Sequence, residues 1–106
     1  MTAELDYWML DGHEPKRVTW DDYRAWMEQG FDVTKRVAAT EIGDVRVSTV
    51  FLSIDHGWGD GPPVLFETMV FGGEMDENQW RYSTWDEAVA GHERVVTAVR
   101  EGRIVE

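Results

Sequence analysis

The segment DHGWGDG at positions 55–61 gathers more chemically active side chains than any other stretch of the sequence. Its two carboxylates, its imidazole and its indole belong to Asp55, Asp60, His56 and Trp58. Glycine-rich loops that follow strands often carry binding residues. The spacing differs from a calcium loop, which needs more acidic ligands and a closing Glu, and zinc would need further His at defined spacing. We therefore interpret the segment as a structural loop or a protein contact surface, with metal binding as the alternative.

Two further ionisable residues occupy positions where the neighbouring sequence predicts burial. Glu67 lies inside an apolar strand, and burying a carboxylate without a partner is costly. We expect Arg46 or Arg81 on a neighbouring strand to pair with it; the alternative is that Glu67 lines a pocket and has a shifted pKa. His92 lies on the apolar stripe of a predicted helix, which favours a packed core histidine over a catalytic base.

Motifs of catalysis and cofactor binding are missing from the sequence. No Ser or Cys lies in a nucleophile motif, there is no H-E-x-x-H spacing, and no Lys follows the glycines as it does in a phosphate-binding loop. His13 follows a turn and is expected to be solvated. We predict no catalytic residue, no resident metal and no cofactor, and an enzyme is the weaker hypothesis.

Composition bounds the class of protein. A chain of 106 residues has room for a single domain, residues 1–106, and the absence of Cys excludes a disulfide-stapled scaffold. The net charge is −11, and residues 55–79 hold six acids and no Lys or Arg. Such a region repels nucleic acid and favours a basic protein surface or a metal cation as its partner. The acids Glu4 and Asp6 do not fit a signal peptide, and no apolar run reaches membrane-spanning length, so we expect a cytoplasmic protein without membrane contact.

The elements that must position these residues follow from hydrophobic spacing and turn signals. We predict strands over 7–10, 33–42, 45–54, 64–71 and 80–83, and helices opened by Thr19 and Thr84 and closed by Gly30 and Gly102. Gly43 and Asp44 suit a hairpin turn. A change of apolar positions in the strand after this turn predicts a bulge or full burial near Thr49.

The simplest packing of these elements is a two-layer α+β sandwich. Two helices would cover one face of a mainly antiparallel sheet of about four to five strands. The segment 64–71 is apolar on both faces except at Glu67 and Thr68, so we place it in the middle of the sheet. Strand order is left open.

Several stretches resemble a known group of proteins: VSTVFL at 47–52, DH at 55–56, GPP at 61–63, LFETMVFGG at 65–73 and WRYSTW at 80–85. With these residues the chain resembles small proteins of unknown function that tailed bacteriophages and prophages encode. The likeness is good over residues 45–92 and looser over 7–11 and 20–26. It implies a phage gene product acting in the host bacterial cytoplasm, and it carries over no activity, cofactor or site residue.

Small size, acidity and six Trp favour a non-enzymatic module that binds a host or phage protein, for instance to inhibit a host factor or a defence factor. The candidate binding residues are Asp55, His56, Trp58, Asp60, Glu67, Trp80 and His92. One alternative is a small-ligand or divalent-metal module in which the 55–63 loop, Glu67 and His92 surround one pocket. The other is a virion assembly component. The oligomeric state is left open.

Overall fold

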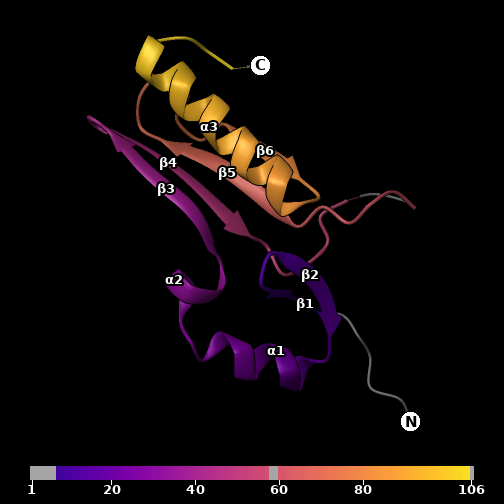
Figure 1. The fold of residues 1–106 in the computed structure, drawn as a ribbon. Helices are drawn as coiled ribbons and strands as arrows, with labels where there is room; N and C mark the ends of the chain where they lie inside the picture. The colour runs from indigo at the N-terminus through magenta and orange to yellow at the C-terminus, as the bar shows by residue number, and fades with distance from the viewer. Residues whose placement is uncertain (1–6, 58–59, 106) are drawn as a thin grey trace.

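A computed structural model describes residues 7–57 and 60–105 of the protein (Figure 1). In chain order its elements are β1 (Tyr7–Asp11), β2 (Glu14–Val18), α1 (Trp20–Met27), α2 (Phe31–Thr34), β3 (Arg36–Ile42), β4 (Val45–Phe51), β5 (Phe66–Phe71), β6 (Gln79–Tyr82) and α3 (Trp85–Glu101). The strands form a four-stranded antiparallel sheet of order β3-β4-β5-β6 and a separate β1-β2 hairpin. The predicted α+β class and the antiparallel sheet are confirmed.

The four-stranded sheet is built from strands that follow one another along the chain. β3 and β4 are joined at Gly43 and Asp44, as predicted, and Gly43 has the positive φ of 59° that a primed hairpin turn requires. β5 lies between β4 and β6, so the segment after Val64 supplies a central strand, as the sequence predicts.

Alternation along β4 decides which side chains enter the core. Val47, Thr49 and Phe51 are buried on the face that α3 covers. The predicted irregularity near Thr49 is present, but the extra residue is Val37 in the facing strand. Arg36 pairs with Val50, whereas Ala38 pairs with Thr49. β4 itself therefore keeps a regular alternation.

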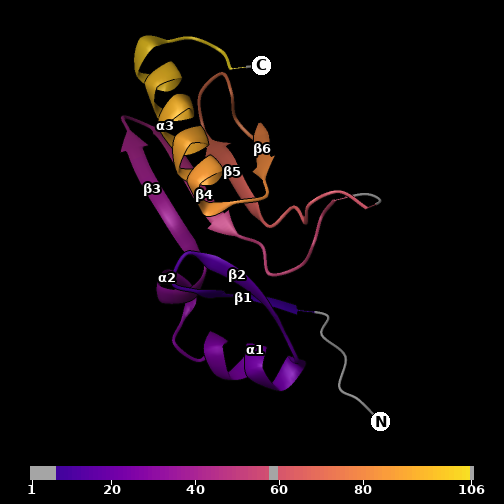
Figure 2. The same ribbon diagram turned by 45° about the vertical axis from the view of Figure 1, so that its right-hand side comes forward.

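α3 crosses one face of this sheet and contacts all four of its strands (Figures 1 and 2). The predicted capping box is present: Thr84 Oγ1 accepts a hydrogen bond from Glu87 N at 3.1 Å, and Glu87 Oε1 accepts one from Thr84 N at 3.1 Å. Gly102, with φ of 68°, ends the helix. Gly91 allows close packing on β6, because a Cβ at this position would overlap the ring of Tyr82.

The core between α3 and the sheet divides into two clusters along the helix. The cluster near the C-terminal end of α3 contains Val47, Val70, Met75, Val95, Val96 and Ala98. The cluster near the N-terminal end contains Phe51, Leu65, Phe66 and Ala88. Both ends of the helix are therefore anchored on the sheet by buried apolar side chains.

The N-terminal lobe, residues 7–35, differs from the prediction. Two of its elements were not predicted: β2, whose sequence EPKRV has little strand character, and α2, which takes the start of the expected strand over 33–42. Moreover, α1 packs mainly on β1 and touches the four-stranded sheet through Trp26, whose ring meets Phe51 at the end of β4, so α3 is the helix that covers a face of that sheet (Figure 2). The reason is that the stripe of α1 is aromatic and its rings meet Tyr7 of β1. Among the described residues, no helix is long and apolar enough to span a bilayer.

Candidate functional site

The loop that follows β4 is exposed, and its first carboxylate has a structural role. Asp55 Oδ1 accepts hydrogen bonds from Gly57 N at 2.7 Å and Val64 N at 2.8 Å, and His56 N donates to Val64 O at 2.9 Å. The backbone donors of Val64 and Gly57 lower the pKa of Asp55. His56 and Asp60 are exposed, and Trp58 lies outside the described residues. Asp55 thus closes the loop by bonding to its backbone.

Glu67 has the partner that the sequence predicts. Its Oε2 lies 2.9 Å from Arg81 Nε on the adjacent strand β6, and its side chain is 14% exposed. Arg46, the other predicted partner, lies 3.9 Å from Glu41 instead. The carboxylate of Glu67 is therefore paired within the sheet.

His92 is a core residue, as the sequence predicts, and it joins a row of threonines of which Thr49 and Thr68 are buried and Thr40 is half-buried. Its Nδ1 lies 2.7 Å from Thr49 Oγ1 and its Nε2 lies 2.9 Å from Thr40 Oγ1. Thr49 Oγ1 in turn lies 2.6 Å from Thr68 Oγ1. Burial lowers the pKa of His92, with a smaller opposing effect from the carboxylate of Glu93. Both ring nitrogens are thus satisfied inside the fold.

The structure does not bring the predicted site residues together. His92 lies between the sheet and α3 with Thr68, whereas the adjacent Glu67 points to the opposite face of β5. Trp80 is half-buried against the core cluster near the C-terminal end of α3. Over residues 7–57 and 60–105, no three His, Asp or Glu side chains are grouped as metal ligands.

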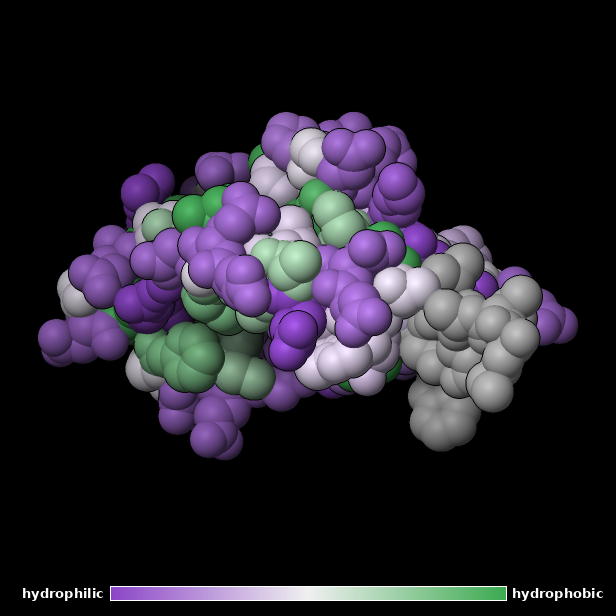
Figure 3. Space-filling model, turned by 90° about the horizontal axis from the view of Figure 1, so that it is seen from below, coloured by the Kyte–Doolittle hydropathy of each residue, from purple (hydrophilic) through white to green (hydrophobic). Residues whose placement is uncertain are grey.

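A cluster of aromatic rings lies instead on the N-terminal lobe, with one ring exposed and two half-buried. We call Tyr7, Trp20 and Tyr23 the aromatic surface. The ring centroid of Tyr7 lies 5.2 Å from that of Trp20 and 5.0 Å from that of Tyr23, with which it stacks. Trp20 is 52% exposed. Figure 3 views the molecule from the side on which α1 lies in Figure 1 and shows hydrophobic side chains among hydrophilic ones.

A row of ring contacts connects the aromatic surface to the core. Tyr23 contacts Trp26 at 6.1 Å between centroids, and Trp26 meets Phe51 edge-on at 5.9 Å. The ammonium of Lys35 lies 5.5 Å from the centroid of the Tyr23 ring. These contacts fix the orientation of Tyr23 and of the rings that pack against it. Trp20 and Tyr23 fall inside the helix that the sequence predicts after Thr19, and neither was predicted to bind a partner; the high Trp content is the sequence signal of such a role.

His13 also enters a ring contact, contrary to the expectation that it is merely solvated. Its ring is exposed but stacks on that of Trp85 at 3.9 Å between centroids and 6° between planes. The stack joins the β1-β2 turn to the first residue of α3. It is a packing contact between the N-terminal lobe and α3.

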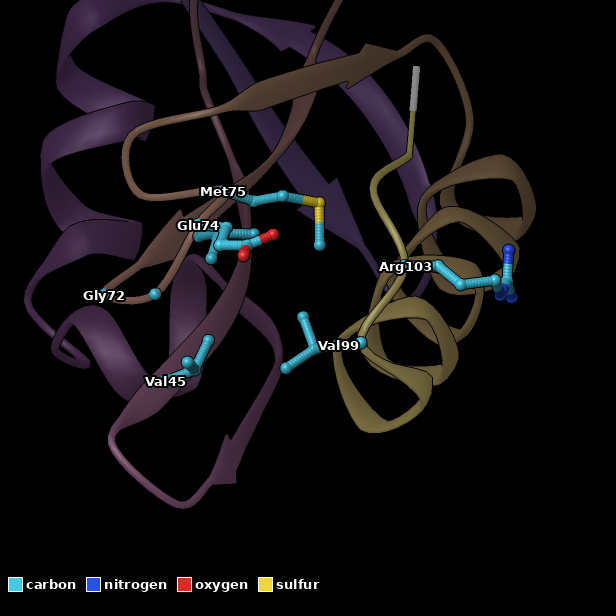
Figure 4. A pocket seen from close by; sticks show the side chains of 9 residues that line it. Val45, Gly72, Glu74, Met75, Val99 and Arg103 are labelled. Atoms are coloured by element: carbon cyan, nitrogen blue, oxygen red, sulfur yellow. The ribbon is translucent and has the colours of Figure 1, made fainter.

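A cavity of about 220 Å³ lies at the C-terminal end of α3 and was not predicted. We call it the C-terminal cavity. Its apolar wall is formed by Val45, Val70, Met75 and Val99, and Glu74 stands beside them (Figure 4).

Comparison of this chain with protein-family models, with curated proteins and with solved structures finds no match. Its function must therefore be argued from the geometry of these sites.

Proposed function

We propose that this protein is a non-enzymatic module that binds another protein through the aromatic surface. The observation that carries the proposal is the half-exposed Trp20, whose ring contacts the stacked pair Tyr7 and Tyr23. Trp and Tyr are the residues most enriched at the energetic centres of protein interfaces. Large exposed apolar side chains that gather in one place typically mark a binding surface.

Preorganisation supports this role. The rings of the aromatic surface already contact one another, and Trp26 links them to buried Phe51. A partner that covers them would find their rotamers fixed and would lose little side-chain entropy in binding. Large contact area at low entropic cost is the reason that Tyr and Trp serve as anchors.

Charge favours a partner with a basic surface. Asp21 and Asp22 follow Trp20 in the first turn of α1, and both are exposed. The chain as a whole carries a net charge of −11. Carboxylates around an aromatic anchor steer a basic partner and fix its orientation.

The proposal includes the biological setting that the sequence resemblance implies. A small phage-type protein acting in the host cytoplasm would bind a host or phage protein, for instance a host factor or a defence factor that it inhibits. The resemblance supports this setting, and the aromatic surface supplies the contact.

The test is to capture partners from a bacterial lysate on the immobilised full chain, and then to titrate the purified partner by calorimetry. We expect Trp20→Ala to raise Kd by about 30-fold or more, the equivalent of about 2 kcal/mol. Affinity for a basic partner should also fall as salt increases.

Two matched variants distinguish this surface from others. Val33→Ala removes an apolar side chain that is 68% exposed in the same lobe, and it should leave Kd unchanged. Asp60→Asn tests the loop that the sequence analysis favoured. An unchanged Kd for Trp20→Ala, with a large effect of Asp60→Asn, would move the contact to the loop and contradict the proposal. Failure to recover any stoichiometric partner would also contradict it.

A further inference from the structure

The C-terminal cavity combines an apolar wall with one carboxylate. Its volume is about 220 Å³, and side chains of Val45, Met75 and Val99 line it together with Glu74. Drug-sized ligands occupy pockets of about 300–1,000 Å³, whereas an engineered apolar cavity of about 150 Å³ holds benzene. The C-terminal cavity therefore has room for a ligand at least as large as benzene, such as a short alkyl chain with its head group, or for one side chain of a partner.

The carboxylate of Glu74 is oriented toward this apolar space. Figure 4 shows it pointing into the space that Met75 and Val99 also face, while the side chain of Arg103 points away. Arg103 Nε donates to Glu101 Oε2 at 2.5 Å, so its charge is engaged elsewhere. Within residues 7–57 and 60–105, Glu74 has no ion-pair partner.

The end of α3 adds to the negative potential at the cavity. Val99 lies in the last turn of the helix and Gly102 is its C-cap, and both line the cavity. The C-terminal end of a helix carries a partial negative charge that stabilises cations. A cation is thus favoured beside Glu74, and an anion is disfavoured.

The walls of the cavity are fixed by contacts within the chain. Gly72 N donates to Asp76 Oδ1 at 2.6 Å, which holds the turn after β5. At Gly73 a Cβ would lie 2.9 Å from Val45 Cγ2, so only glycine fits there without displacing the wall. Val105 N lies 3.4 Å from Met75 Sδ and ties the residues after α3 to the same turn.

From this geometry we infer that the C-terminal cavity binds a primary ammonium group on a short unbranched alkyl chain. The chain lies among Val45, Met75 and Val99, and the ammonium lies at the carboxylate of Glu74. This chemistry has two sources, a free alkylamine and the lysine side chain of a protein. The inference is independent of the aromatic surface, which lies in the N-terminal lobe.

The experiment is a titration of the methyl-labelled full chain with n-butylammonium chloride, followed by NMR at constant ionic strength. We expect saturable shifts of the methyl groups of Val45, Met75 and Val99. Each methylene removed from the ligand should weaken binding by about two- to fourfold. Neutral n-butanol should bind about threefold more weakly than n-butylammonium, and butyrate more weakly still.

Variants test the carboxylate. Glu74→Gln should weaken n-butylammonium by about threefold and remove its advantage over n-butanol. Glu77→Gln changes an exposed acid of the same turn that does not line the cavity, so its affinity should equal that of the natural chain. Trp20→Ala should also leave amine binding unchanged, which separates this inference from the proposed function.

A second arm identifies the source of the ammonium. If a capped Gly-Lys-Gly peptide shifts the same methyl groups and its norleucine counterpart does so more weakly, the site accepts protein lysine. If only the free amine binds, the ligand is a small alkylamine. Shifts that do not saturate, or equal affinities for n-butylammonium and n-butanol in both the natural chain and Glu74→Gln, would overturn the inference.

Discussion

The sheet with α3 and the N-terminal lobe are stabilised in different ways. Six residues of α3 are buried, whereas α1 has none. In the described part of the lobe, only Val18 and Thr34 are buried, and ring contacts make up much of its packing. The sheet and α3 thus form a core of their own, while the lobe depends on the surface against which it packs.

The shape of the molecule reflects this difference. The radius of gyration is 15.1 Å and the principal extents are 54 × 31 × 20 Å. A compact domain of this length would have a radius of about 13 Å. The lobe extends the molecule beyond the sheet and α3 and exposes rings that a rounder fold would bury. The partial exposure of the aromatic surface is therefore a consequence of the way in which the lobe is attached.

The largest effect is expected where the two regions meet. Phe51 is 1% exposed and contacts both Trp26 of the lobe and Phe66 of the core. Phe51→Ala should lower the free energy of unfolding by about 3–5 kcal/mol, because it removes buried area and leaves a cavity. Urea denaturation followed by circular dichroism measures this loss.

Trp26→Ala is the matched variant from the lobe side of the same contact. It should loosen the lobe locally and cost the sheet and α3 less than Phe51→Ala does. Hydrogen exchange should then show faster exchange in α1 and unchanged protection in α3. Equal acceleration in both helices would contradict the division into two regions.

An effect of intermediate size on the free energy of unfolding is expected on acidification, because His92 is buried in the core. Burial lowers the pKa of His92 in the folded protein, while the unfolded chain titrates near 6.5. Below this pH the unfolded chain binds a proton that the folded protein does not, so stability falls as pH decreases from 6.5 toward the lowered pKa. Above about pH 7.5 the imidazole is neutral in both states and the residue contributes no slope.

Urea denaturation between pH 7.5 and 5.5 measures this dependence. One proton corresponds to a slope of at most about 1.4 kcal/mol per pH unit. Asp55 affects stability in a separate, more acidic pH range. Because its pKa is lowered in the folded protein, the stabilisation by its ionised carboxylate is lost only as pH falls below about 4. His92→Gln should abolish the dependence above pH 5.5, and His56→Gln in the exposed loop should retain it. A slope that survives His92→Gln would contradict the assignment.

The sequence predicts the sheet and α3 far better than the lobe. The hairpin at Gly43, the capping box at Thr84 and the burial of His92 all rest on local signals that tertiary packing reinforces. β2 and α2 lack such signals: EPKRV contains a Pro and charged residues, and α2 has four residues. Their conformation is set by pairing with β1 and by contacts around Gly30, which a one-dimensional pattern does not encode.

The candidate sites were predicted less well for a related reason. Residue types indicated that Glu67 needs an Arg partner, and Arg81 provides it. No sequence spacing predicts that Glu74 lies beside Val45 and Val99. These three residues are far apart in the chain and line one cavity because α3 ends over the β3-β4 hairpin. Likewise, Tyr7 meets Trp20 and Tyr23 because α1 turns back onto β1. Both sites arise from tertiary packing.

The smallest changes in stability are expected from removing the N-cap hydroxyls of α1 and α3. Thr84 takes part in a reciprocal capping box on a helix with a buried face, so Thr84→Ala should lower the free energy of unfolding by about 1 kcal/mol. Thr19 Oγ1 accepts a single hydrogen bond, from Asp22 N at 3.3 Å, on a helix without a buried residue. Thr19→Ala should therefore fray α1 and change global stability by less than about 0.5 kcal/mol. Urea denaturation gives the global values and hydrogen exchange of α1 gives the local one, with Thr97→Ala on the exposed face of α3 as a control. A larger global loss for Thr19→Ala than for Thr84→Ala would show that the lobe and the core unfold as one unit.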